Sequence, residues 1–254
     1  MSSVLKKMGF SLEIHKNRKA MGEAAGKKAE ELIVKYLSLK KEIRIIAASA
    51  PSQNETVAYL AKSKLIDWKR VTAFHMDEYI GLPETDPRNF GIWLKDRLFS
   101  KVPIKQVHYL NGNAADPEKE CARYAALLKK APIDLLLGGI GENGHLAFND
   151  PPIADFNDPL TVKILNITLT SRNQQVHDGC FAALKDVPKK AYTLTIPILQ
   201  SASSLVYTIP KATKAAAVGK MMKDALSTKA PCTFLRFHPD CYVFVDSDSG
   251  KELL

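Results

Sequence analysis

The segment Ile133-Asp134-Leu135-Leu136-Leu137-Gly138-Gly139-Ile140-Gly141-Glu142-Asn143-Gly144-His145 joins a short apolar run to a loop that is rich in glycine. The apolar run has the length and composition of a buried β-strand. The glycines after it allow the backbone to pass close to a ligand. Because α/β proteins bind ligands beyond the carboxyl ends of their strands, this segment predicts a binding loop at the edge of a sheet.

Similar apolar runs occur along the rest of the chain and alternate with segments of helical periodicity. We expect strands at 43–47, 71–74, 107–110, 133–137, 192–196, 205–209 and 242–245. Helices are expected at about 16–39, 54–64, 89–98, 117–129 and 213–226, with Asn54 as the N-cap of the second. Alternation of this kind predicts an α/β fold with a mainly parallel sheet and helices on both faces. A single domain over residues 1–254 is expected.

The composition is typical of a globular protein. Hydrophobic residues make up 46% and charged residues 25% of the 254 residues, which is enough apolar material to offset the entropy lost on folding. No stretch approaches the roughly 18 continuous apolar residues of a membrane span. Residues 1–7 lead into no apolar signal segment, and none of the four cysteines forms a C-x-x-C pair. We therefore expect a cytoplasmic protein with no membrane partner.

The net charge of +9 is spread over separated lysine pairs. These pairs are Lys6-Lys7, Lys27-Lys28, Lys40-Lys41, Lys129-Lys130 and Lys189-Lys190. Because they form no basic stripe and no aromatic residues are interleaved with them, nucleic acid is not an expected partner. The excess charge suits a small anionic substrate, and it equally suits a solvated basic surface.

Polar loops follow three of the predicted strands, at residues 49–54, 75–79 and 138–150. The carboxyl ends of parallel strands lie at one edge of a sheet, so these loops are expected to meet there. His145 would then lie near the carboxylates of Asp77, Glu78 and Asp150. A histidine that shares a crevice with several carboxylates is suited to proton transfer.

Other chemistries fit these loops less well. Gly139-x-Gly141-x-x-Gly144 is formally a dinucleotide-binding pattern, but it continues into Pro151-Pro152 and not into a long helix. An ordinary strand-exit turn is an open alternative for this loop. No G-x-S-x-G elbow of a serine hydrolase is present. Four side chains have the types of metal ligands without the spacing, so no metal is expected: His75, Asp77, Glu78 and His145.

Several of these segments resemble the motifs of glucosamine-6-phosphate deaminases. The matching segments are Phe74–Pro83 (F-x-M-D-E-Y-x-G-L in the family), Leu110–Ala114 (L-x-G-N-A), Gly138–Pro151 (G-G-x-G-x-[DN]-G-H-x-[AG]-F-N-E-P), Val187–Ala191 and His238-Pro239. They follow the family's order over about 42–245. The related 6-phosphogluconolactonases have a different tail after the histidine, A-S-L-F-P, so Phe148–Pro151 favours the deaminase branch.

The resemblance implies a modified Rossmann-like domain. It also implies an aldose–ketose isomerisation that releases ammonia from an amino-sugar phosphate, without a metal or organic cofactor. Asp77 would move a proton between C2 and C1, and His145 would assist opening of the sugar ring. Asn143 and Asp150 would orient His145 or tune its charge. The residues expected to bind substrate or its phosphate are Ser49, Ser52, Gln53, Gly141, Arg172 and Lys214.

The chain departs from the family's pattern in its phosphate loop and near its histidine. The loop, usually [ST]-G-[GS]-T-P, reads Ser49-Ala50-Pro51-Ser52-Gln53, and its proline has no N–H to donate. Its remaining donors at a helix N-terminus would still suit an oxyanion. Asn143 stands where many members have Asp, and Asp150 replaces the usual Glu. Arg172 matches the first of two family arginines, whereas the second, expected to bind phosphate, is His177 here.

Three functions are left open by the sequence. The first is a deaminase/isomerase acting on glucosamine 6-phosphate or galactosamine 6-phosphate, and the motifs favour it. The second is a 6-phosphogluconolactonase-like hydrolase or an isomerase of another sugar phosphate, because one fold hosts several chemistries. The third is a non-catalytic sugar-phosphate-binding protein, which the changed loop and Asp150 suggest. The partner expected in each case is a small sugar phosphate, and a homo-oligomer is an open alternative to a monomer.

Overall fold

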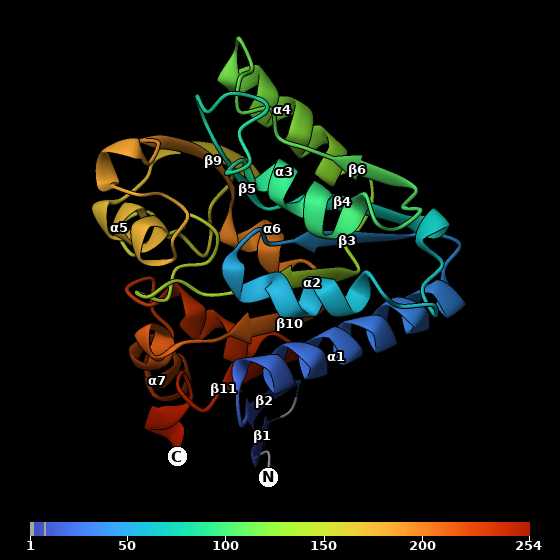
Figure 1. The fold of residues 1–254 in the computed structure, drawn as a ribbon, viewed down its shortest axis with the longest axis vertical. Coiled ribbons are helices and arrows are strands. Elements are labelled where there is room, and N and C mark those ends of the chain that lie inside the picture. Colours follow the sequence, from blue (N-terminus) through green and yellow to red (C-terminus); the bar gives the residue numbers. More distant parts are fainter. Residues whose placement is uncertain (1–2, 8) are drawn as a thin grey trace.

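The computed structural model describes residues 3–7 and 9–254. An eight-stranded sheet runs through the molecule in the order β1-β2-β11-β10-β7-β3-β4-β6 (Figure 1). Its strands are β1 (Ser3–Lys7), β2 (Phe10–His15), β3 (Ile43–Ala47), β4 (Val71–His75), β6 (Gln106–His108), β7 (Leu135–Gly138), β10 (Ser204–Ile209) and β11 (Cys241–Asp246). Only β1 pairs antiparallel among these described strands. The predicted mainly parallel α/β sheet is therefore confirmed.

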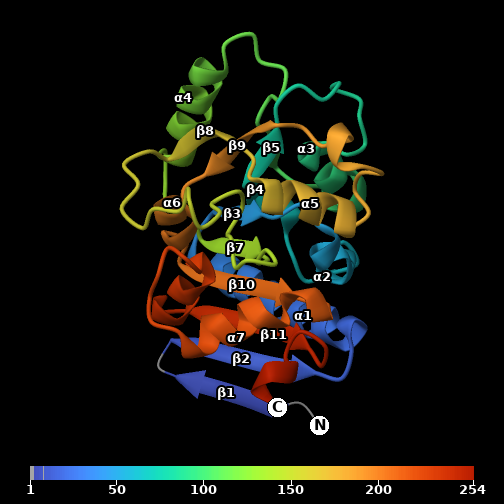
Figure 2. The same cartoon turned by 90° about the vertical axis from the view of Figure 1, so that its left-hand side faces the viewer.

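Helices cover both faces of this sheet (Figure 2). They are α1 (Arg18–Leu39), α2 (Asn54–Leu60), α3 (Phe90–Leu94), α4 (Pro117–Leu128), α5 (Leu169–His177), α6 (Ile196–Gln200) and α7 (Ala215–Lys223). Apolar side chains of α1 and α2, with Leu94 of α3, join one buried cluster, and those of α4, α6 and α7 join another. Phe90 of α3 packs in a third, smaller cluster. The first two clusters lie on opposite faces because successive side chains of a strand point to opposite sides.

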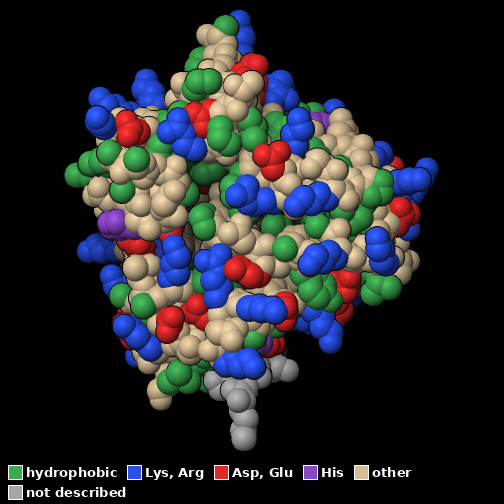
Figure 3. Space-filling model, in the orientation of Figure 1, with side chains coloured by type: hydrophobic (Ala, Val, Ile, Leu, Met, Phe, Trp, Pro, Cys, Tyr) green, Lys and Arg blue, Asp and Glu red, His purple; other side chains and the backbone are tan. Residues whose placement is uncertain are grey.

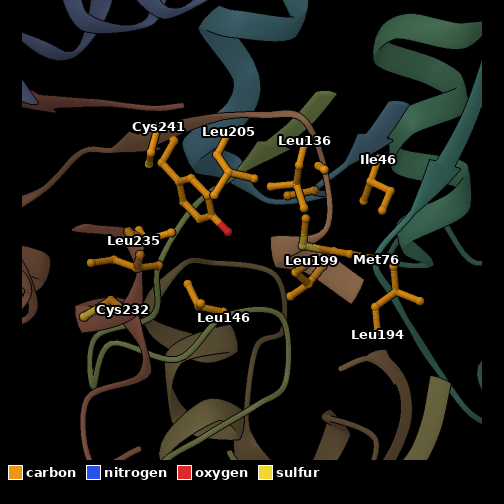
Figure 4. Close-up of a cluster of buried hydrophobic side chains, with 14 of the residues drawn as sticks. Ile46, Met76, Leu136, Leu146, Leu194, Leu199, Leu205, Cys232, Leu235 and Cys241 are labelled. Atoms are coloured by element: carbon orange, nitrogen blue, oxygen red, sulfur yellow. The ribbon is translucent and has the colours of Figure 1, made fainter. Parts of the chain in front are cut away.

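Strand β7 shows this alternation most clearly. Leu136 packs in the cluster that also holds Ile46 and Leu205 (Figure 4), whereas Leu135 and Leu137 pack on the side of α1. All three β7 leucines are 0–1% exposed. The apolar run in 133–137 is therefore a strand that is buried on both faces, as its continuous hydrophobicity predicted.

A second, three-stranded antiparallel sheet stands at the carboxyl edge of the first. Its order is β5-β9-β8, with β5 at Asp77–Tyr79, β9 at Lys190–Leu194 and β8 at Val162–Asn166. The strand expected at 192–196 belongs to this sheet and ends at Leu194, because Ile196 and Pro197 open α6. Strand β5 begins only two residues after β4 ends, so Asp77 at its start lies beside the predicted binding loop.

Several predicted boundaries were wrong by a few residues. The helix expected at 54–64 ends at Leu60, and Asn54 is not its N-cap, because its backbone is already helical and Gln53 precedes the helix without a side-chain cap. The helix expected at 213–226 is α7 and ends at Lys223. Strands β1 and β2 were not predicted. Met1, Ser2 and Met8 lie outside the described residues, so the absence of a leader at residues 1–7 stays a prediction.

The surface agrees with the charge pattern. On the face drawn in Figure 3, Lys and Arg side chains are scattered and interspersed with Asp and Glu. No helix in the described part of the chain has both the length and the apolarity that crossing a bilayer requires.

We predict that Leu136→Ala destabilises the protein by about 2–5 kcal/mol, because it removes buried methyl groups and leaves a cavity. The Tm should fall by about 5–15 °C. Leu65→Ala is the matched control: the Leu65 side chain is 70% exposed, so the same truncation should change stability by less than about 0.5 kcal/mol. Equal effects in thermal unfolding would contradict the assignment of Leu136 to the core.

Candidate active site

A cavity opens at the carboxyl edge of the parallel sheet, and about 730 Å³ of space free of protein atoms lies in it and in its solvent-open mouth. Loops after β3, β4, β7 and β10 surround it, and α5 contributes the remaining side. The predicted site residues that line it are Ser49, Ser52, Asp77, Gly141, His145 and Lys214. The rule that parallel strands present their loops at one edge therefore places these residues together, although they are up to 165 positions apart in the chain.

Asp77 enters this cavity from the start of β5. Its side chain is buried, and burial together with the neighbouring charge of Glu78 raises the pKa of Asp77 well above the ordinary value. Glu78 points away, since it is next on the strand: its carboxylate accepts the backbone N–H groups of Phe90 (3.0 Å) and Gly91 (2.8 Å). Burial raises the pKa of Glu78 to about 7 although these N–H groups favour its charged form. Asp77 is therefore the carboxylate that faces the cavity.

His75 lies in the core and not in the cavity. Its Nε2 accepts the backbone N–H of Leu110 at 2.8 Å, and burial lowers the pKa of His75 to about 3, so the ring is neutral. Glu78 lies beside it, with His75 Nδ1 4.0 Å from Glu78 Oε2. The other two potential metal ligands, Asp77 and His145, line the cavity, so the four side chains do not gather at one place. Within residues 3–7 and 9–254, no group of three or more His, Cys, Asp or Glu side chains is arranged to hold a metal ion.

His145 is held by three polar side chains on one of its ring nitrogens. Nδ1 lies 2.9 Å from Asn143 Oδ1, 3.1 Å from Ser171 Oγ and 3.3 Å from Asp150 Oδ1. Asn143 donates its Nδ2 to Asp150 at 2.8 Å, which leaves Asn143 Oδ1 as the acceptor for His145. Nδ1 therefore carries a hydrogen, and the neutral ring has its lone pair on Nε2.

Asp150 is fully buried behind this histidine. Burial raises the pKa of Asp150, but hydrogen bonds from His145, Asn143 and Ser171 outweigh burial and hold the pKa below its ordinary value. Ser171 Oγ is 2.8 Å from both carboxylate oxygens. The carboxylate thus reaches its partners although Asp150 is one methylene shorter than the family's glutamate. The sequence did not indicate a role for Ser171, although the resemblance assigned the adjacent Arg172 to substrate binding.

Gly141 allows the ring of His145 to sit where it does. A Cβ atom on residue 141 would lie 2.1 Å from His145 Cε1, far inside van der Waals contact. The Gly141 N–H also donates to the His145 carbonyl at 2.9 Å, which closes the loop on itself. Glycine at this position is therefore required by the approach of the histidine ring to the backbone.

Another part of the cavity wall carries groups suited to an anion. Ser49 Oγ is buried and has no hydrogen-bond partner in the described part of the protein. Lys214 is only 4% exposed, and its ammonium makes no hydrogen bond or ion pair with any described residue. Burial lowers the pKa of Lys214 to about 8, partly opposed by the charges of Asp178 and Glu142. A buried ammonium and a buried hydroxyl without protein partners suit a phosphate group.

Two predicted phosphate ligands lie outside this wall. Gln53 is buried behind the loop, where its Nε2 donates to Gly138 O at 2.9 Å and so ties residues 51–53 to the end of β7. Arg172 donates to the carbonyls of Leu184 (2.7 Å) and Val187 (3.0 Å) and points away from the cavity. Neighbouring residues of a helix differ by about 100° in direction, so Ser171 faces His145 while Arg172 does not. The residues of this wall that sequence reasoning did not assign include Gln174, Gln175, Asp178 and Lys211.

Comparisons with known proteins agree with this geometry. Residues 16–163 match the family described as glucosamine-6-phosphate isomerases/6-phosphogluconolactonase. A glucosamine-6-phosphate deaminase of Listeria innocua is 35% identical over 231 residues, which cover 91% of this chain and 96% of that protein. A monomeric glucosamine-6-phosphate deaminase of known structure superposes with a TM-score of 0.85 at 26% identity, over 94% of this chain and 98% of that one. The 6-phosphogluconolactonase of Thermotoga maritima shares the fold, with a TM-score of 0.76 at 20% identity over 92% and 98% of the two chains.

The burial of Asp77 predicts a pH-dependent stability. Because its pKa is raised on folding, the folded protein binds the proton more tightly than the unfolded chain, and stability is lost as the pH rises above about 3.9 toward the raised pKa. Asp77→Asn removes this loss. We therefore expect the Tm of the variant, relative to wild type, to be higher at pH 8 than at pH 5.

This comparison cancels any pH-independent cost of the amide. Asp67→Asn removes an exposed carboxylate and serves as the control, with a Tm that should follow wild type across the same pH range. Curves of Tm against pH that run parallel for Asp77→Asn and wild type would show that the carboxyl group of Asp77 does not titrate differently in the fold.

Proposed function

The chain belongs to the family of glucosamine-6-phosphate isomerases and 6-phosphogluconolactonases, and we propose that it converts a hexosamine 6-phosphate into a ketohexose 6-phosphate and ammonia. The resemblance indicated by the sequence motifs is confirmed by this membership. The observation that carries the proposal is the single cavity that combines Asp77 and His145 with Ser49 and Lys214. It offers groups for proton transfer and groups for phosphate in one enclosure.

Phosphate binding would place the sugar. Lys214 would supply a buried positive charge, and Ser49 and Ser52 would supply hydroxyl groups beside it. A charge-assisted hydrogen bond in a buried site is stronger than one in water, so this anchor would orient the sugar carbons toward Asp77. Pro51 contributes no N–H, which makes the serine hydroxyls more important here than in a glycine-rich loop.

Ring opening would use His145. In the tautomer that Asn143 imposes, Nε2 can accept a proton from the sugar's C1 hydroxyl and return one to the ring oxygen. Asp150 would keep its negative charge 3.3 Å from Nδ1. This charge would stabilise the imidazolium that exists after the proton is accepted and before it is returned. The charge that Asn143 lacks is therefore provided by Asp150.

Isomerisation would use Asp77. Its carboxylate removes the proton from C2 of the open aldose and returns it to C1, while a second proton passes from the C2 amine to the C1 oxygen. The C1 aldehyde thereby becomes an alcohol and the C2 amine becomes an imine. Water then adds to C2, and ammonia leaves as the ketone forms. A carboxylate whose pKa is raised is a stronger base near neutral pH than an exposed one, and this suits it both to take and to return the proton.

The lactonase alternative is less well supported. The tail Phe148-Asn149-Asp150-Pro151 supplies the carboxylate beside His145, and it differs from the tail that distinguishes the lactonases. The lactonase neighbour at 20% identity shares the fold alone. A cytoplasmic location is proposed with the activity, because Cys121, Cys180, Cys232 and Cys241 are all free thiols.

We predict that the purified protein releases ammonia from glucosamine 6-phosphate or galactosamine 6-phosphate, with one ketose phosphate formed per ammonia. Asp77→Asn should lower kcat by about 10³-fold, because an amide cannot accept the C2 proton. Asp67→Asn should retain wild-type kcat.

Two other outcomes would replace the proposal. Hydrolysis of 6-phosphogluconolactone without ammonia release from either amino sugar would identify a lactonase. Thermal stabilisation by the sugar phosphates without any turnover would identify a binding protein, because a ligand that binds only the folded state raises its stability.

Ser171 is proposed as a positioning residue, acting through Asp150 and His145. Ser171→Ala should lower kcat by about tenfold while KM changes by less than about twofold. Loss of this hydrogen bond should also raise the pKa of Asp150 and move the acidic limb of the kcat–pH profile to higher pH. Ser201→Ala, which removes an exposed hydroxyl, is the matched control. An unshifted profile with unchanged kcat would limit Ser171 to a structural role.

A further inference from the structure

Lys211 occupies an unusual backbone conformation beside the cavity. It follows Pro210 after the end of β10, with φ +80° and ψ 142°. L-residues with a side chain rarely adopt this region, and glycine adopts it freely. The Lys211 N–H donates to Asp246 Oδ2 at 3.2 Å, and Asp246 is buried at the end of the neighbouring strand β11. The fold therefore holds a lysine in a conformation that favours glycine.

The side chain of Lys211 lines the same cavity as Lys214. Its ammonium forms an ion pair with Asp178 Oδ1 at 2.7 Å, and Asp178 directly follows α5 and lines the cavity as well. The Lys211 side chain is 37% exposed, whereas that of Asp178 is 13% exposed. The lysine end of this pair is thus the more accessible one, and it faces space that a ligand can enter.

The charges of the wall leave a phosphate incompletely neutralised. A phosphate monoester carries a charge of about −2 near neutral pH, and Lys214 supplies only one positive charge. Arg172 is bound to backbone carbonyls, and His177 is an exposed side chain 3.4 Å from Glu142. Lys211 is the remaining cation among the described residues that line the cavity.

We propose that Lys211 is a second phosphate-binding side chain, which exchanges its ion pair with Asp178 for one with the phosphate of the substrate. This inference rests on the proposed function and adds a specificity to it. Because an entering anion must compete with the Asp178 carboxylate, a dianionic phosphate monoester gains more from Lys211 than a monoanion does.

Inorganic phosphate is the probe that tests this without catalysis. We expect Lys211→Gly to bind phosphate about tenfold more weakly than wild type in isothermal titration calorimetry, since one charge-assisted contact is lost. Glycine adopts φ +80° without strain, so this variant should unfold at a Tm no lower than that of wild type. With that Tm, weaker binding cannot result from misfolding. Lys129→Ala removes an exposed lysine directly after α4 and should leave the Kd unchanged.

Asp178→Asn tests the exchange from the other partner. It releases Lys211 from competition, so we expect phosphate to bind at least about threefold more tightly than to wild type. A wild-type Kd in Lys211→Gly, or no phosphate binding to wild type at millimolar concentrations, would overturn the inference.

Ammonia release separates the two proposals. If Lys211→Gly turns over substrate with an unchanged KM, the proposed function stands and the role of Lys211 is excluded. If phosphate binding depends on Lys211 but the protein shows no turnover, the role of Lys211 stands and the proposed function is excluded.

Discussion

The close approach of the His145 ring to the Cα of Gly141 is the constraint on which the site depends. No side chain fits between them, so the loop after β7 must carry glycine at 141 and fold back through the Gly141 N–H to the His145 carbonyl. Asn143, between these two residues, then reaches Nδ1 and fixes the tautomer. A short loop thereby determines which nitrogen of the histidine is available for chemistry.

The rest of the molecule supplies this loop with neighbours. Parallel strands end at one edge, and the loops after β3, β4 and β10 bring Ser49, Asp77 and Lys214 to the same cavity. The small antiparallel sheet turns Asp77 inward and Glu78 outward by the ordinary alternation of a strand. Burial then acts in opposite directions on the groups of the cavity: it raises the pKa of Asp77 and lowers that of Lys214.

The sequence predicted those strands and site residues that are marked by a local pattern of residue types. Strand β7 is a continuous apolar run and β3 is apolar except for Arg44, and the parallel-edge rule correctly brought Asp77 and His145 to one cavity. Arg172 was misplaced because α5 was not predicted, and the direction of a side chain is undefined without its helix. Ser171 and Lys211 act on partners 21 and 33 residues away, Asp150 and Asp178, so no local pattern marks them. Strand β2 was not predicted, although its apolar and polar residues alternate over six positions, a pattern typical of a half-buried strand.

Leu146, which follows His145 directly, is 1% exposed and packs in the core beside Leu235 and Cys232 (Figure 4). His145 is therefore joined through the backbone to a residue whose side chain can leave the core only when part of the core unfolds locally. Such openings are rare events compared with the motions of a surface loop. His145 accordingly meets each substrate already oriented, and little reorganisation of the loop is needed during turnover.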